Sequence, residues 1–124
     1  MKSKRIKTIV DTKNGADGTT YEPIEPAGPC ALQLDLDGGS GGASGVTVTV
    51  EATAQEGATS PVYIDITDDL FGSASFTADA ILFDDLGILA MFDAVRIKIV
   101  ASTGAADDAD WRIDLAEIYD WPAP

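Results

Sequence analysis

Strict alternation of apolar and polar residues recurs along this chain and constrains its fold more than any other feature. In residues 30–37, Cys30 and three leucines fall on one face, while Ala, Gln and Asp fall on the other. A period of two residues places alternate side chains on opposite faces of a β-strand. Four later segments repeat the pattern with many Val, Ile and Thr residues: 46–52, 62–66, 94–101 and 111–119. The chain is therefore predicted to form strands with one buried face.

These strands predict an all-β fold. Loops rich in Gly, Ser or Asp separate the alternating segments, and 124 residues suffice for one hydrophobic core. An antiparallel β-sandwich or jelly-roll-like domain over residues 30–124 accommodates this order. Residues 67–93 fit neither the strand nor the helix period. Short strands at 74–77 and 80–83, or a helical turn at 86–91, stay open there.

Two hairpins are predicted from neighbouring strands. The first pairs residues 46–52 with residues 62–66, and three side chains of its second strand would point inward: Val62, Ile64 and Ile66.

The last two alternating segments form the second predicted hairpin, and charge selects its register. Placing Ile97 opposite Leu115, and likewise Ile99 opposite Ile113, sets Lys98 across from Asp114 on the outer face. A slip of two residues would set Lys98 against Arg112, which is unfavourable.

The N-terminal residues 1–29 differ from the rest in charge and composition. Five of the eight basic residues lie within the first thirteen positions, whereas the whole chain carries a net charge of −13. Residues 14–29 contain three prolines and three glycines, which disfavour a helix or a central strand. Residues 1–29 are accordingly predicted to be an extended basic arm followed by a Pro/Gly-rich linker.

Two functions for the basic arm stay open. Four of its residues could anchor the protein electrostatically to an anionic partner: Lys2, Lys4, Arg5 and Lys7. Alternatively, the arm folds back on its own domain as an extra strand through Ile6, Thr8 and Val10. The acidic remainder should repel nucleic acid and anionic membranes, so neither is expected as a partner. No signal peptide or membrane-spanning run is apparent, and synthesis in the cytoplasm is expected.

Catalytic and cofactor-binding groups are scarce in this sequence. It contains no histidine, which removes the commonest general base and any Ser-His or Cys-His pair. The single cysteine, Cys30, lies on the apolar face of its strand and is predicted to be a core thiol. The Asp68–Asp69 and Asp84–Asp85 pairs are typical of solvated turns or helix caps. We therefore expect no enzymatic activity and no cofactor.

A calcium ion and a sugar are the two ligands that the sequence keeps open. The acidic loop with Asp107, Asp108 and Asp110 offers the oxygen ligands that calcium prefers, although solvated carboxylates are the simpler explanation. Trp111 shares one strand face with Tyr119 and Trp121, which could stack on a sugar or bury against a neighbouring subunit. Trp111 itself is predicted to be buried.

Four segments together resemble the small β-sandwich proteins that tailed bacteriophages encode beside their capsid genes: VTVTVEAT, PVYIDIT, FDAVRIKIVAST and DWRIDLAEIY. The resemblance implies a virion structural protein, such as a head decoration, cement or fibre-base protein. It also implies a homo-oligomer, with a trimer favoured, and the major capsid protein or another virion protein as the partner. The alternative is a receptor- or carbohydrate-binding β-sandwich module of a tail tip or a bacterial protein.

Overall fold

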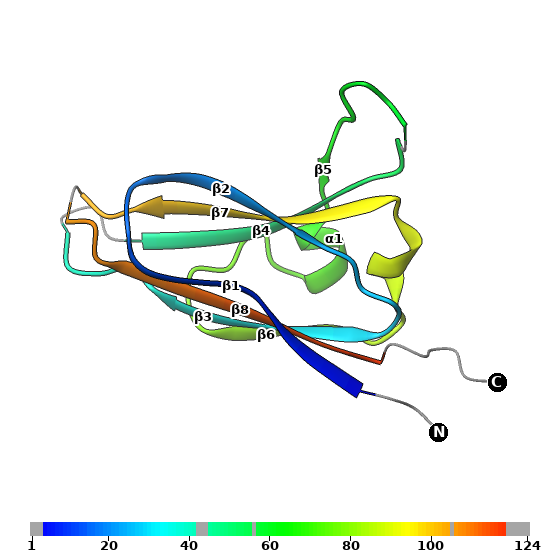
Figure 1. Cartoon of the computed structure of the whole chain (residues 1–124), viewed down its shortest axis with the longest axis horizontal. Helices are drawn as coiled ribbons and strands as arrows, with labels where there is room; N and C mark the ends of the chain where they lie inside the picture. Colours follow the sequence, from blue (N-terminus) through cyan, green and yellow to red (C-terminus); the bar gives the residue numbers. More distant parts are fainter. Residues whose placement is uncertain (1–3, 42–44, 56, 105, 119–124) are drawn as a thin grey trace.

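Two antiparallel sheets of four strands each form the molecule, and they pack face to face (Figure 1). The computed structural model describes residues 4–41, 45–55, 57–104 and 106–118. The first sheet has the strand order β1-β8-β3-β6, and the second has the order β2-β7-β4-β5. The predicted all-β sandwich is confirmed.

The elements follow one another in this order: β1 (Lys4–Gly15), β2 (Gly18–Ile24), β3 (Cys30–Asp37), β4 (Gly45–Thr53), β5 (Ile64–Asp65), α1 (Thr67–Phe71), β6 (Ala80–Asp84), the 3-10 helix η1 (Ile88–Met91), β7 (Ala94–Ser102) and β8 (Ala109–Ile118). Within the described residues, neither α1 nor η1 has the length and apolarity of a membrane-crossing helix.

The core lies between the sheets and is built from the alternating positions. Its main side chains, each at most 8% exposed, come from β3, β4, β7 and β8: Cys30, Leu32, Leu34, Val46, Val48, Val50, Ile97, Ile99, Trp111, Ile113 and Leu115. Alternation therefore identified the buried face of all four strands correctly, including the burial of Cys30 and Trp111. Gly15 lies against the Trp111 ring, since a Cβ there would be 2.3 Å from Cη2.

The predicted hairpin of the last two strands is wrong. β7 pairs with β2 and β4 in one sheet, while β8 pairs with β1 and β3 in the other. Lys98 consequently lies between Tyr21 and Thr49 rather than opposite Asp114. Strands that face each other across a sandwich bury the same side chains as strands that pair side by side, so alternation does not distinguish the two arrangements.

The predicted pairing of the first hairpin is partly confirmed. β4 and β5 pair antiparallel, with Glu51 opposite Asp65 and Ala52 opposite Ile64. The inward orientation is wrong for Val62 and Ile64, which are 59% and 60% exposed. β5 has only two residues at the edge of its sheet, and the connection from β4 stands out from the sandwich (Figure 1). Side chains there have no opposite sheet to pack on.

The N-terminal segment is part of the sandwich. β1 pairs with β8 and β2 pairs with β7, so the prediction that residues 14–29 form a linker is wrong, and the alternative of an extra strand is correct. β2 tolerates Pro23 because it is an edge strand, where a missing N–H leaves no ladder bond unmade on its outer side.

The ambiguous region 67–93 contains both kinds of element. β6 confirms the strand predicted at 80–83, and η1 lies within the predicted turn at 86–91. Near the other predicted strand, Phe76 makes an isolated bridge to Val48. The short helix α1 was not predicted, because five residues are too few for a helical period to appear.

Candidate functional site

The basic residues of β1 surround a buried glutamate. The Glu117 side chain is fully buried, and its Oε1 accepts hydrogen bonds from Nε of Arg5 at 2.9 Å and from Nη2 of the same guanidinium. Nζ of Lys7 lies 3.8 Å from that oxygen, and the Ala27 N–H donates to Oε2 at 3.0 Å. Lys4 is exposed at the outer face, and Lys2 lies outside the described residues. Two of the four predicted anchor residues thus bind their own domain.

The environment of Glu117 favours its charged form. Burial raises the pKa of this carboxyl, but the Ala27 N–H together with Arg5 and Lys7 outweighs that effect and holds the pKa below its ordinary value of 4.5. The unfolded chain therefore binds a proton here at a higher pH than the folded chain does. The stabilisation from this group is present above pH 4.5 and is lost as the pH falls through the folded pKa.

Replacing Glu117 with Gln should lower the melting temperature at pH 7 and flatten its dependence on pH between about 5 and 3. The variant keeps the shape of the side chain but removes the group that protonates. Thermal melts of both proteins over this range provide the measurement. An unchanged acid sensitivity in the Gln variant would contradict the assignment.

Cys30 lies beside this cluster and is not poised as a nucleophile. Burial, and then the negative charges of Asp84 and Glu117, raise the pKa of its thiol to about 12. A thiol in this state is protonated at neutral pH and reacts slowly.

The carboxylate pair at the end of β6 has two different environments. Asp84 is 2% exposed, and its two oxygens accept the N–H groups of Ile88 and Leu89 at 2.8 Å each. This carboxylate caps η1, as predicted for such a pair, whereas Asp85 is exposed.

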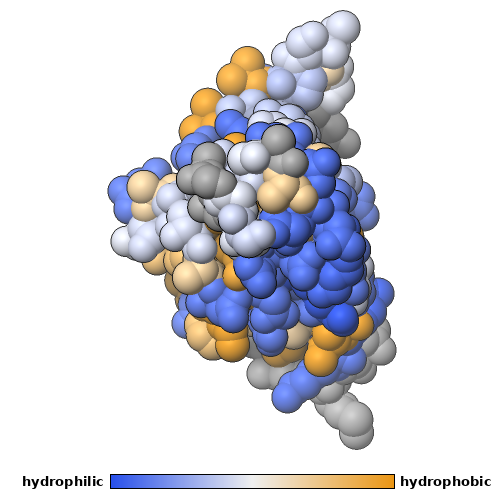
Figure 2. Space-filling model, turned by 90° about the vertical axis from the view of Figure 1, so that its left-hand side faces the viewer, coloured by the Kyte–Doolittle hydropathy of each residue, from blue (hydrophilic) through white to orange (hydrophobic). Residues whose placement is uncertain are grey.

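The candidate calcium ligands do not converge. Oδ2 of Asp108 accepts the N–H and the hydroxyl of Ser40, and Oδ1 of Asp110 accepts the Asn14 N–H at 3.0 Å. Asp107 is exposed in a left-handed conformation with φ of 50°. Within the described residues, no three or more Cys, Asp or Glu side chains are arranged to hold a metal ion. Asp108 and Asp110 instead hold Ser40 and Asn14 at the end of the sandwich that Figure 2 faces, where many hydrophilic residues lie.

Excess EDTA should leave the melting temperature of the protein within about one degree, because a bound ion would add stabilisation by mass action and the described carboxylates of this loop do not converge into a metal site. Thermal melts with EDTA, with added calcium and with neither provide the measurement. A chelator-sensitive drop that calcium reverses would restore the calcium hypothesis.

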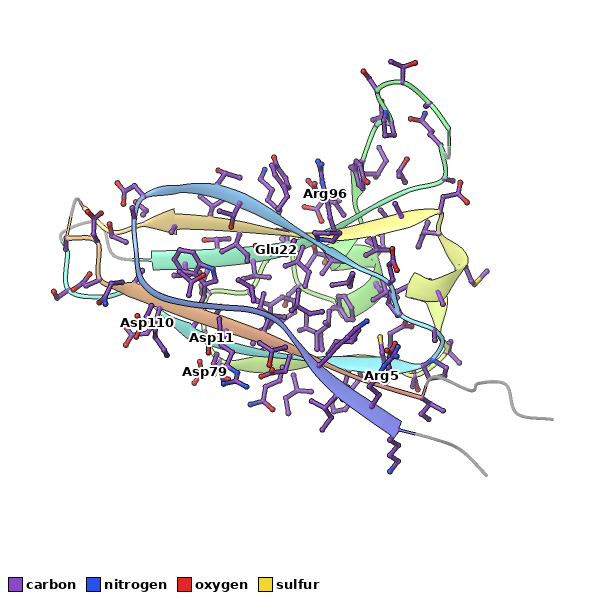
Figure 3. All side chains as sticks on the ribbon, in the orientation of Figure 1. Arg5, Asp11, Glu22, Asp79, Arg96 and Asp110 are labelled. Carbon is purple, nitrogen blue, oxygen red and sulfur yellow. The ribbon has the colours of Figure 1, made fainter. Side chains whose placement is uncertain are left out.

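A second acidic region lies on the outer face of the first sheet. Asp35, Asp37, Asp79 and Asp110 line a shallow groove together with Arg112. Asp79 and Asp110 lie at the same end of the sandwich (Figure 3), and Oδ1 of Asp79 accepts the Leu36 N–H at 2.8 Å. The groove is open, Arg112 offsets part of its negative charge, and three of its carboxylates, those of Asp37, Asp79 and Asp110, accept backbone N–H groups.

Arg96 joins the two edges of the second sheet. Its guanidinium lies 4.0 Å from the Tyr21 ring centroid and 3.8 Å from that of Tyr63, and Nε donates to Glu51 at 2.8 Å. Figure 3 shows it on the outer side of that sheet. Both rings make cation–π contacts with the guanidinium, so these two tyrosines stabilise the fold through Arg96. Tyr119 and Trp121, for which stacking on a sugar or burial against a neighbouring subunit was left open, lie outside the described residues.

The first sheet also carries an exposed apolar row that sequence reasoning missed. Ile6, Ala116, Ala31 and Phe83 lie side by side on β1, β8, β3 and β6. Ile6 is 75% exposed and Phe83 is 67% exposed. Alternation alone suggests which face of a strand is buried, but only the strand order shows that these four residues are neighbours.

No protein-family model matches the sequence, and no curated protein matches it either. Among solved structures, the chain is similar to a protein of Bacillus endospore appendages, which form disulfide-linked pili. The identity is 17% and the TM-score 0.42, over 95% of this chain and 90% of that one.

Two further similar structures are much longer than this chain, which covers about a third of each. A family two carbohydrate esterase from Cellvibrio japonicus has 13% identity and a TM-score of 0.33, over 94% of this chain and 34% of that one. The VP2 subviral particle of infectious bursal disease virus has 13% identity and a TM-score of 0.36, over 95% and 33%. TM-scores this low support no conclusion about the function of this chain.

Proposed function

We propose that this protein is a non-catalytic structural component of a virion, of the decoration, cement or head-fibre type found on tailed-phage capsids. The observation that carries the proposal is the exposed apolar row across the first sheet, because contiguous exposed apolar side chains on a small domain mark a protein-binding surface. The resemblance of four strand segments to phage β-sandwich proteins supplies the virion context.

The distribution of ionisable groups supports a structural role over a catalytic one. The sequence has no histidine, and the buried carboxylates Asp84 and Glu117 bind backbone N–H groups or cations of their own domain. Catalysis would need an acid or base free to exchange protons with a substrate in a cleft. These carboxylates stabilise the fold instead.

The charge of the protein suits attachment to another protein. At a net charge of −13, it is repelled by nucleic acid and by anionic membranes, and the basic side chains of Arg5 and Lys7 are engaged by Glu117. The proposed partner is the major capsid protein or another virion protein. The proposed location is the assembled particle after synthesis in the host cytoplasm.

Mass spectrometry of particles purified from cells that carry this gene would test the proposal. Peptides of this protein should co-sediment with the major capsid protein at many copies per particle. Particles that lack the protein, or a protein found only in the soluble fraction, would refute the virion assignment.

A further inference from the structure

The apolar row forms a trough with a low floor and two high walls. The floor is made by Ala31 and Ala116, which are neighbours on the central strands β3 and β8. Ile6 on the edge strand β1 and Phe83 on the edge strand β6 form the walls. A groove of about 440 Å³ runs over this floor and is lined almost wholly by apolar atoms. A volume of this size accommodates an aromatic side chain from another molecule.

We propose that two copies of this chain associate face to face, with Phe83 of each copy inserted into the alanine trough of the other. The trough supplies a hole, and the exposed Phe83 ring beside it supplies a knob of matching chemistry. A two-fold axis that runs parallel to the strands, between Ala31 and Phe83, places the Phe83 ring of each copy over the trough of the other. Contacts of this kind are isologous, and each is made twice.

The charges on the two sides of the trough favour the same arrangement. Lys4 lies on the β1 side of the groove and Asp85 lies on the β6 side, so opposite charges flank one apolar floor. The two-fold axis brings the β6 side of one copy toward the β1 side of the other. Lys4 of each copy is then drawn toward Asp85 of the second copy, which selects this orientation against one that joins like charges.

The negative charge on the rest of the surface explains why two copies should meet through the apolar trough. Two copies with a net charge of −13 each repel at long range, and a contact through the acidic loop end would add to that repulsion. The rim of the trough carries one positive and one negative side chain, Lys4 and Asp85, so a contact there adds no further repulsion. The inference goes beyond the virion role, because it assigns the apolar row to a second copy of this chain and not to the capsid protein.

Sedimentation equilibrium of the purified chain should show a monomer–dimer equilibrium that Phe83→Asp weakens at least about 10-fold. Ala31→Gln should weaken it similarly by filling the trough, and Gln33 already occupies an equivalent outward position on the same strand. Val62→Asp is the matched control, because it adds the same charge at an exposed apolar residue in the connection before β5, away from the first sheet, and should leave the equilibrium unchanged. Circular dichroism verifies that each variant is folded.

Charge exchange tests the orientation. Lys4→Glu and Asp85→Lys should each weaken the dimer, and the double variant should restore it to within about twofold of the original affinity. A monomer at about 100 μM protein, a trimer in place of a dimer, or equal weakening by Phe83→Asp and Val62→Asp would overturn the proposal. Absence of the protein from virions would not contradict the proposed dimer and would count only against the virion role.

Discussion

Deletion of residues 2–13 is expected to destabilise the sandwich by roughly 5 kcal/mol, enough to lower its melting temperature by well over 10 °C. β1 pairs with β8 along most of its length, from Lys4 opposite Ile118 to Gly15 opposite Ala109. Ile9 and Val10 also pack against the core. The loss of several ladder hydrogen bonds, at about 1 kcal/mol each, and of this apolar contact accounts for the magnitude. Thermal and urea unfolding of the truncated protein provide the measurement.

Point variants distinguish the stability that comes from the pairing of β1 from the stability that comes from its basic side chains. Arg5→Ala should cost about 2 kcal/mol, because it removes the nearest cation from the buried Glu117 carboxylate, with Lys7 and the Ala27 N–H remaining. Lys4→Ala, the matched control one residue away on an exposed side chain, should change stability by less than about 0.5 kcal/mol. A truncated protein that melts with the intact one would show that β1 is not part of the folded domain.

Asp84→Ala is expected to destabilise the protein by about 2–4 kcal/mol, since it leaves the buried N–H groups of Ile88 and Leu89 without an acceptor. Loss of this cap also releases η1, whose Leu89 is 1% exposed and packs in the core. The neighbouring exposed residue provides the control, because Asp85→Ala removes the same charge without removing a buried hydrogen bond.

Urea unfolding of the two alanine variants should therefore separate them by at least about 1.5 kcal/mol. Asp84→Asn should recover part of the loss, because an amide oxygen still accepts one N–H. Equal destabilisation by Asp84→Ala and Asp85→Ala would mean that the effect comes from charge alone, and the capping role of Asp84 would be wrong.

The candidate site was only partly accessible from the sequence. The basic residues Arg5 and Lys7 were visible as a charge cluster, but their partner Glu117 lies at the other end of the chain, and no local spacing connects them. The apolar trough was also hidden, because Ile6, Ala31 and Phe83 belong to strands that are distant in sequence and become neighbours only through the order of the sheet. Long-range pairing therefore determines both features.

Alternation along the chain by itself determined the strands β3, β4, β7 and β8, their inward faces, and the core positions of Cys30 and Trp111. Those properties follow from the two-residue period of a single strand and need no knowledge of its neighbours. Tertiary structure alone decided that β7 and β8 lie in opposite sheets and that the Pro/Gly-rich segment after β1 continues as the edge strand β2. The physical reason is that the apolar face of a strand is buried equally well against any apolar layer. The choice of neighbouring strand therefore depends on the free energy of the whole sandwich and not on the pattern of one strand.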